Sequence, residues 1–223
     1  MIKTIGIVAA LYCLTVLCSC QKEVDPFTDT PDTDSTSASE GYMPLTTGTF
    51  WVYKDSGFSN SYDTTTVLEE DTMINNITFT KVHTVSAIED NDVYYAIKDH
   101  NYYLNAEENG INVTMLVLND TASVGNSWMY DMGNINGIPG KGTGTIVEKL
   151  ATYTVQGETY TDVIHTQYVM SYNLLGTYTD FATYNFYFAK GKGIIRIKSV
   201  LEDVLGTGDG LTATQELIDY GIK

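Results

Sequence analysis

Few residues of the types that catalyse reactions or bind metals are present, and they are not spaced for either task. The three histidines, His83, His100 and His165, have no H-E-x-x-H motif and no histidine two positions away, the spacings that favour a metal site. No G-x-S-x-G nucleophile motif occurs. Gly140-Lys141-Gly142 departs from a phosphate-binding loop, since Ile135 stands where that motif begins with glycine and no Ser or Thr follows the lysine. We interpret Gly140, Gly142 and Gly144 as a flexible loop or a bulge. We therefore expect no metal, no cofactor and no enzymatic activity.

Carboxylates keep one catalytic alternative open. The chain has 28 Asp and Glu side chains, and glycoside hydrolysis needs two of them on opposite sides of the scissile bond. Nothing in their spacing marks one pair above another. A hydrolase that acts on glycans through two carboxylates is the alternative to a non-catalytic protein.

Two pairs of adjacent tyrosines are candidates for a binding surface. Tyr94-Tyr95 and Tyr102-Tyr103 lie on segments with strand composition. Neighbouring residues of a strand face opposite sides, so one tyrosine of each pair is expected to point away from the core. Exposed tyrosines stack on sugar rings or anchor protein partners; ordinary cross-strand pairing on a solvated face is the other interpretation.

A basic stripe is the second candidate surface, formed by Lys190, Lys192, Arg196 and Lys198. Even spacing places these four on one face of a strand, provided that Gly193 introduces no bulge. The stripe could receive an anionic glycan, or it could pair with acids of the same domain.

These residues must be positioned by β-strands, because Thr, Tyr, Val and Ile dominate the chain after Gly41 and no long helical periodicity occurs. Turn pairs such as Asn75-Asn76 and Gln156-Gly157 favour two-residue hairpins. Strands without intervening helices pair antiparallel. We predict an all-β fold, a single antiparallel curved sheet or barrel. Its twelve strand segments are residues 49–54, 64–70, 77–88, 93–98, 102–106, 111–118, 144–150, 153–155, 159–172, 183–189, 194–200 and 214–220.

The domain also shows an internal similarity. Gly48 to Tyr53 resembles Gly125 to Tyr130, and Ile74 to Val82 resembles Val155 to Val163 in the same order. Two sequential repeats of similar hairpin units, residues 42–118 and 122–203, would explain the match. Chance similarity between strands of biased composition is the alternative.

The N-terminus has the layout of an export signal. A basic start is followed by an apolar run from Ile5 to Leu17, which is shorter than the ~20 residues that a membrane helix needs. Leu17-Cys18-Ser19-Cys20 resembles the lipobox of bacterial lipoproteins. The resemblance implies that residues 1–19 are a signal peptide and that Cys20 carries the lipid, including palmitate or a similar acyl chain. Two or more acyl chains anchor a protein stably to a membrane.

Residues 20–40 are predicted to form a disordered acidic tether of Asp, Thr, Ser and Pro, and residues 41–223 the β domain. Removal of residues 1–19 removes Lys3 and no acid, so the mature chain has 28 acidic and 11 basic side chains, a net charge of −17. Such a charge argues against binding nucleic acid or an anionic membrane surface. The lipid is therefore the expected contact with the membrane.

Several motifs resemble an uncharacterised family of lipoproteins of the Bacteroidota outer envelope. Tyr42-Met43-Pro44-Leu45 followed by Gly48, Trp51 and Tyr53 is similar to the family opening Y-x-P-L-x-x-G-x-x-W-x-Y. Val124 to Trp128 and Tyr187 to Ile195 are similar to later family signatures, although Lys192 replaces the usual apolar residue. The resemblance implies an all-β fold and supplies no activity. The large rings of Trp51 and Trp128 are expected to anchor the core, and a ligand platform is the alternative.

Two threonines, Thr72 and Thr121, follow an aspartate and precede an apolar residue. This pattern resembles the acceptor site of Bacteroidota O-glycosylation and predicts glycan on both.

Taken together, the sequence predicts an exported outer-membrane lipoprotein on the periplasmic or cell-surface side, which binds a glycan or an envelope protein without catalysis. A carrier of an apolar ligand in a β cavity is a further alternative.

Overall fold

The computed structural model describes residues 41–57, 61–87, 90–108, 111–135, 137–202 and 210–223. The predicted signal peptide, the lipid on Cys20 and the tether lie outside the described residues. The described chain is all β without a helix, as predicted. Its strands are β1 (Phe50–Ser56), β2 (Tyr62–Ile74), β3 (Ile77–Val85), β4 (Asp90–Lys98), β5 (Asn101–Glu108), β6 (Ile111–Asn119), β7 (Ser127–Ile135), β8 (Ile138–Val155), β9 (Glu158–Leu174), β10 (Thr177–Ala189), β11 (Gly193–Leu201) and β12 (Leu211–Gly221).

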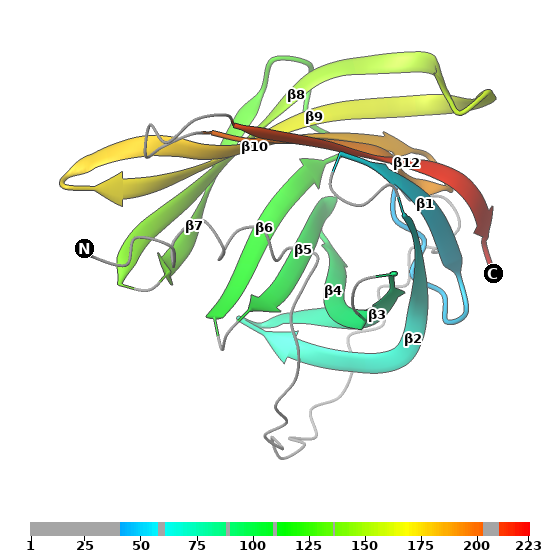
Figure 1. Cartoon of the computed structure of the whole chain (residues 1–223), viewed down its shortest axis with the longest axis horizontal. Helices are drawn as coiled ribbons and strands as arrows, with labels where there is room; N and C mark the ends of the chain where they lie inside the picture. Colours follow the sequence, from blue (N-terminus) through cyan, green and yellow to red (C-terminus); the bar gives the residue numbers. More distant parts are fainter. Residues whose placement is uncertain (1–40, 58–60, 88–89, 109–110, 136, 203–209) are drawn as a thin grey trace.

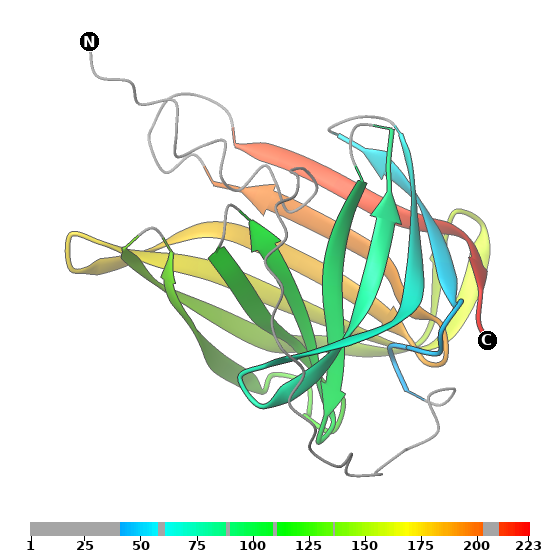
Figure 2. The ribbon, with the colours of Figure 1, turned by 90° about the horizontal axis from the view of Figure 1, so that it is seen from below.

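All twelve strands form one antiparallel sheet that curls into a nearly closed barrel (Figures 1 and 2). The order is β6-β5-β4-β3-β2-β1-β12-β11-β10-β9-β8-β7, so two six-stranded meanders meet where β1 pairs with β12. Short hairpin connections explain this order, because antiparallel neighbours need only a tight turn.

Side-chain hydrogen bonds join the edge strand β6 to the other edge strand, β7, and to β9. Trp128 Nε1 on β7 donates to the carbonyl oxygen of Leu116 on β6 at 2.8 Å. Thr166 Oγ1 on β9 donates to the carbonyl oxygen of Val117 at 2.9 Å. These bonds satisfy carbonyls that would otherwise lie unpaired at the edge of the sheet.

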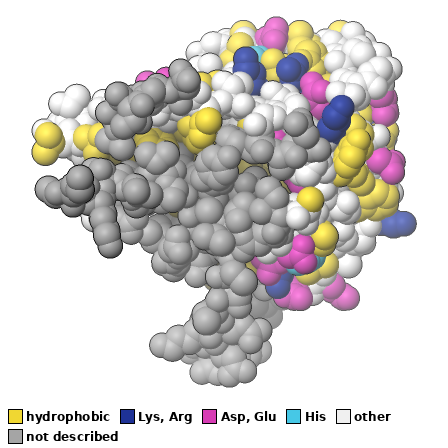
Figure 3. All heavy atoms as spheres, viewed as in Figure 1, with side chains coloured by type: hydrophobic (Ala, Val, Ile, Leu, Met, Phe, Trp, Pro, Cys, Tyr) yellow, Lys and Arg dark blue, Asp and Glu magenta, His cyan; other side chains and the backbone are white. Residues whose placement is uncertain are grey.

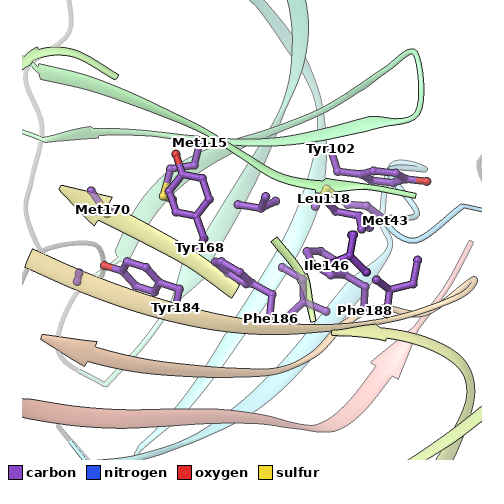
Figure 4. Packing of buried hydrophobic residues seen from close by; sticks show 14 of the residues in the cluster. Met43, Tyr102, Met115, Leu118, Ile146, Tyr168, Met170, Tyr184, Phe186 and Phe188 are labelled. Atoms are coloured by element: carbon purple, nitrogen blue, oxygen red, sulfur yellow. The ribbon is translucent and has the colours of Figure 1, made fainter. Parts of the chain in front are cut away.

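Side chains fill the interior of the barrel. One cluster includes Met115, Ile146, Tyr168, Phe186 and Phe188, whose side chains face one another in Figure 4. A second cluster surrounds the indole ring of Trp51. Burial of this apolar surface is the main favourable term for folding a domain that has no cysteine after residue 20. Such a filled interior gives no support to the predicted carrier of an apolar ligand.

The first residues of the domain cover one end of the barrel, which we call the plugged end. Met43 is buried in the first cluster, and Leu45 packs against both clusters. The carbonyl oxygen of Gly41 accepts from the amide of Gly191 in the β10–β11 turn at 2.7 Å. The chain therefore enters the domain at the plugged end, and the β7–β8 and β9–β10 turns lie at the opposite end.

Every predicted strand segment overlaps an observed strand, and one strand was missed. Residues 144–150 and 153–155 belong to the single strand β8, and β7 was not among the predicted segments. The sequence of β7, SWMYDMGNI, contains Asp, Gly and Asn, which are depleted in strands.

The prediction of a flexible loop or bulge at Gly140, Gly142 and Gly144 was wrong, because all three lie within β8. A Cβ atom at Gly144 would overlap the indole ring of Trp128, and one at Gly142 would overlap the phenol of Tyr168. The glycines make room for large rings on the interior face of a regular strand.

Turn chemistry was predicted in part. Asn75, Asn76, Gln156 and Gly157 all have positive φ, as two-residue hairpin turns of this type require. The pairs Asp99-His100 and Leu175-Gly176 also have positive φ and were not predicted.

The turns that precede β1 and β7 make equivalent hydrogen bonds. In the first, Thr49 N donates to Thr46 O at 3.0 Å and Gly48 N to Val67 O at 2.9 Å. In the second, Asn126 N donates to Ser123 O at 3.0 Å and Gly125 N to Ile146 O at 2.8 Å. Matching turns at the start of each meander are what two sequential repeats would produce, and the duplication stays an interpretation.

Candidate functional site

A groove of about 530 Å³ lies beside the edge strand β7, near the end of the barrel opposite the plug. Its volume is within the range of sites that hold small molecules. Its lining combines an aromatic ring, a thioether, a cation, a carboxylate and an amide. The residues are Met129, Asp131, Gly133, Asn134, Pro139, Gly140, Lys141 and Tyr178.

The β7–β8 hairpin supplies most of this lining. Lys141 pairs with Asp131 across the hairpin and with Ser171 on β9. Because side chains alternate along a strand, Lys141 points to the face opposite that of its neighbours Gly140 and Gly142, which face interior rings. The groove therefore lies on the outer surface of the barrel.

Tyr178 forms the aromatic wall of the groove. It follows the β9–β10 turn, and 43% of its surface is exposed. The Nζ atom of Lys141 lies 4.3 Å from the centroid of its ring, a cation–π contact that orients the ring. In Figure 3, hydrophobic side chains are visible at the tip of this hairpin, at the far left. Large apolar side chains at the surface beside polar groups are typical of recognition sites.

A β-bulge shapes the edge of the groove. The pairing of β7 with β8 shifts between Asp131 and Gly133, where Gly133 has a φ of 75°. The amide of Gly133 donates to Oδ1 of Asp131 at 2.9 Å. The bulge removes one donor from the edge of β7 and interrupts the regular backbone that an incoming strand would need.

The four predicted surface tyrosines do not form one exposed patch. Tyr102 is buried, and its hydroxyl donates to Oδ2 of Asp120 at 2.8 Å. Tyr94, Tyr95 and Tyr103 are half-buried. Tyr95 packs against both interior clusters, and burial raises its pKa to about 12. Tyr103 contacts the rings of Phe79 and Tyr130.

The predicted basic stripe is divided between a turn and a strand. Lys190 and Lys192 lie in the β10–β11 turn, and the Lys192 ammonium lies 4.6 Å from the ring centroid of Tyr220. Arg196 and Lys198 lie on β11 beyond an extra residue at position 195. Arg196 Nε lies 3.3 Å from Oε1 of Glu216, so its charge pairs with an acid of the same domain.

The two predicted glycan acceptors lie on different elements. Thr72 is half-buried near the end of β2, and Thr121 is exposed in the turn after β6. The Thr121 hydroxyl donates to Oδ1 of Asn119 at 2.7 Å. Glycan on either threonine remains a prediction.

His165 belongs to a packed cluster that holds the β8–β9 hairpin against the outer face of the barrel. Its side chain is 10% exposed and lies 3.1 Å from Oε1 of Glu148 and 3.1 Å from Oδ1 of Asn185. Its ring stacks on Tyr187 with centroids 4.2 Å apart, and Tyr187 stacks in turn on Tyr153. Burial and the neighbouring Tyr153 raise the pKa of Tyr187 to about 12. Figure 1 shows this hairpin projecting over β12.

The other two histidines each bind one carboxylate at the surface. His83 Nδ1 lies 2.7 Å from Oδ1 of Asp92, and His100 Nδ1 lies 2.9 Å from Oδ1 of Asp120. Within the described residues, no group of three His, Cys, Asp or Glu side chains is placed to hold a metal ion.

One pair of acids is buried at the far end of the barrel, where β1 ends and β2 begins. Asp63 accepts from Gln215 Nε2 at 3.2 Å and from Ser61 Oγ at 3.4 Å. Burial raises the pKa of Asp63, and the charge of nearby Asp55 raises it further.

Replacing Asp63 with asparagine should increase thermal stability at neutral pH. A carboxyl group whose pKa is raised in the folded state stabilises the fold while it is protonated, and that contribution is lost as the pH rises through the folded pKa. We expect Asp63→Asn to raise Tm by a few degrees at pH 7 and to leave it unchanged below the ordinary aspartate pKa of 3.8. Calorimetry at both pH values measures this.

Asp92→Asn is the matched control, with the opposite sign. Burial raises the pKa of Asp92, but hydrogen bonds from His83 and Lys81 outweigh burial and leave it lowered. Asp92→Asn should therefore lower Tm at pH 7. A lower Tm for Asp63→Asn at pH 7 would contradict the assigned electrostatics of the pair.

The comparisons with known proteins bear on the fold. A crystal structure described as that of a "putative lipoprotein" from Parabacteroides distasonis superposes with a TM-score of 0.51 over 82% of this chain and 99% of that chain, at 12% sequence identity. At that identity, the likeness shows a shared fold. No protein-family model and no curated protein matches the sequence. The described part of the chain contains no helix long and apolar enough to cross a membrane.

Proposed function

We propose that this protein is a lipoprotein anchored in the outer membrane, whose barrel binds a glycan in the groove beside Tyr178. The observation that carries the proposal is an exposed tyrosine ring in a groove of about 530 Å³ that also contains a carboxylate and an amide. Sugars present apolar C–H faces that pack on such a ring, and hydroxyls that hydrogen-bond to such polar groups.

The position of the groove fits a protein tethered to a membrane. The chain enters the domain at the plugged end, through the contact between Gly41 and Gly191. The groove lies near the opposite end of the strands, beside the β7–β8 and β9–β10 turns. A lipid on Cys20, joined to Gly41 by residues 21–40, would therefore leave the groove facing away from the bilayer. The lipobox and the resemblance to envelope lipoproteins support this arrangement, on either the periplasmic or the cell-surface side.

A glycan fits this groove better than an added protein strand. Edge strands bind partner strands through an unbroken row of backbone donors and acceptors. In β7 that row is interrupted at the bulge, where the amide of Gly133 is already bonded to Asp131. A sugar ring needs no such row.

A glycan array with the mature lipidated protein in detergent tests the proposal. We expect binding to a defined set of oligosaccharides, and Tyr178→Ala should weaken it about tenfold or more, the effect of losing a central aromatic contact. Tyr62→Ala is the control, because Tyr62 is also exposed but does not line the groove. Equal loss in both variants, or no specific binding by the wild type, would overturn the proposal.

A further inference from the structure

The ammonium of Lys141 lies in the groove without a carboxylate of the described chain beside it, in contrast to the cations of Lys81 and Arg196. Lys81 lies within 3.1 Å of both Glu70 and Asp92, and Arg196 pairs with Glu216. Among the described residues, no carboxylate lies within 4.0 Å of the Lys141 ammonium, which instead contacts the ring of Tyr178. Lys141 therefore presents a positive charge inside the groove that the domain does not neutralise by a direct ion pair.

The carboxylate of Asp131, on the strand next to Lys141, binds a backbone amide of its own strand. Asp131 pairs with Lys141 in the β7–β8 ladder, yet its Oδ1 accepts from the amide of Gly133 at 2.9 Å. This bond fixes the carboxylate at the bulge. The Lys141 ammonium can therefore pair with an anionic group of a ligand. The second oxygen of Asp131 and the amide of Asn134 can form hydrogen bonds with ligand hydroxyls.

We propose that the groove selects an acidic oligosaccharide, with a carboxylate of the ligand paired to Lys141 and the sugar face packed on the exposed part of Tyr178. The inference rests on the proposed function and names the class of sugar. The protein as a whole carries a net charge of −16, which repels anions at long range. Selection of an acidic sugar must therefore come from a local contact, and the unpaired cation in the groove provides it.

The positive charge of Lys141 predicts a preference for acidic sugars over neutral ones. A hydrogen bond between an ammonium and a carboxylate contributes more than one between neutral groups. We expect an acidic sugar to bind about tenfold more tightly than its neutral counterpart at low ionic strength. Salt should reduce that preference, because the groove is open to solvent and the pair is screened.

Calorimetric titration of the mature lipidated protein in detergent tests the inference with two matched probes. One is a trimer of galacturonic acid, and the other is the same trimer with each carboxylate reduced to a hydroxymethyl group. The wild type should prefer the acidic trimer about tenfold. Lys141→Gln should weaken binding of the acidic trimer about tenfold more than binding of the neutral trimer, so that the preference is lost, and Lys141→Arg should keep most of it.

Lys198→Gln is the control, since Lys198 is exposed on β11 outside the groove. It should leave the preference unchanged, and thermal unfolding of every variant checks the fold. If the wild type binds both trimers equally, or if Lys141→Gln retains the acidic preference, the inference is overturned and the proposed glycan function stands. If a glycan array shows no oligosaccharide bound, the proposed function fails and this inference fails with it.

Discussion

Replacing Gly142 with alanine is expected to lower the free energy of unfolding by at least about 3 kcal/mol, the upper part of the range for an overpacked core. A Cβ atom at this position would overlap the hydroxyl and ring of Tyr168. The tyrosine cannot move aside, because it is fully buried among the aromatic side chains of β10 (Figure 4). Urea denaturation followed by tryptophan fluorescence measures the loss.

Gly137→Ala is the matched control for the same chemical change. No atom lies within 4 Å of a Cβ at Gly137, whose φ is 81°, so the cost is confined to backbone strain of about 1 kcal/mol. Equal losses at the two positions would show that β8 does not pack against Tyr168 as described.

A second variant separates steric overlap from any other effect of the methyl group. Within the described residues, the Tyr168 hydroxyl is buried without a hydrogen-bond partner. Tyr168→Phe alone should therefore cost less than about 1 kcal/mol or stabilise the protein, because a buried polar group without a partner is removed. In the double variant Gly142→Ala/Tyr168→Phe, part of the loss should be recovered, and the recovered energy measures the clash.

The fold was largely predictable because most strands carry their own signal. Segments such as residues 77–85 and 159–172 combine β-branched and aromatic residues with marked turns at Asn75-Asn76 and Gln156-Gly157. Strand β7 carried no such signal, since its Asp131 and Gly133 form a bulge. The glycines of β8 were interpreted as a loop or a bulge because the sequence does not show which side chains they contact. Two of these glycines leave space for the rings of Trp128 and Tyr168, which belong to other strands.

The candidate groove could not be located from the sequence because it depends on distant segments. Tyr178 lies between Thr177 and Thr179 without a recognisable motif, almost forty positions after Lys141. Only the pairing of β8 with β9 and of β9 with β10 brings the two together. The adjacent tyrosine pairs were easier to recognise in the sequence. In this barrel, however, other side chains pack on both faces of the strand that carries Tyr102 and Tyr103. Tyr102 is buried and Tyr103 contacts Phe79 and Tyr130.

Trp51 is expected to be the most sensitive position in the first meander. Its side chain is 2% exposed, and its Nε1 atom donates to the carbonyl oxygen of Lys192 at 2.6 Å. It also packs over Gly193, where a Cβ atom would lie 3.0 Å from Nε1. One residue thus joins β1, at the start of the domain, to the β10–β11 turn near its end.

Trp51→Ala should lower the free energy of unfolding by about 3–5 kcal/mol, the typical loss for truncating a buried aromatic side chain. Domains of this kind have total stabilities of about 5–15 kcal/mol, so the variant approaches global unfolding. Circular dichroism during thermal and urea denaturation measures the change. Val124→Ala, at an exposed position in the turn before β7, should change stability by less than about 0.5 kcal/mol.

Trp51→Phe keeps the prediction testable if the alanine variant does not fold. Phenylalanine retains most of the buried ring but cannot donate to Lys192, so the carbonyl loses its partner at a cost of about 1–3 kcal/mol. The loss should exceed that of Val124→Ala and stay below that of Trp51→Ala. If Trp51→Phe and Trp51→Ala both have the same midpoint of urea denaturation as the wild type, then Trp51 is not a core residue. Its ring would instead be available as a ligand platform, and the contact between β1 and the β10–β11 turn would not hold the two meanders together.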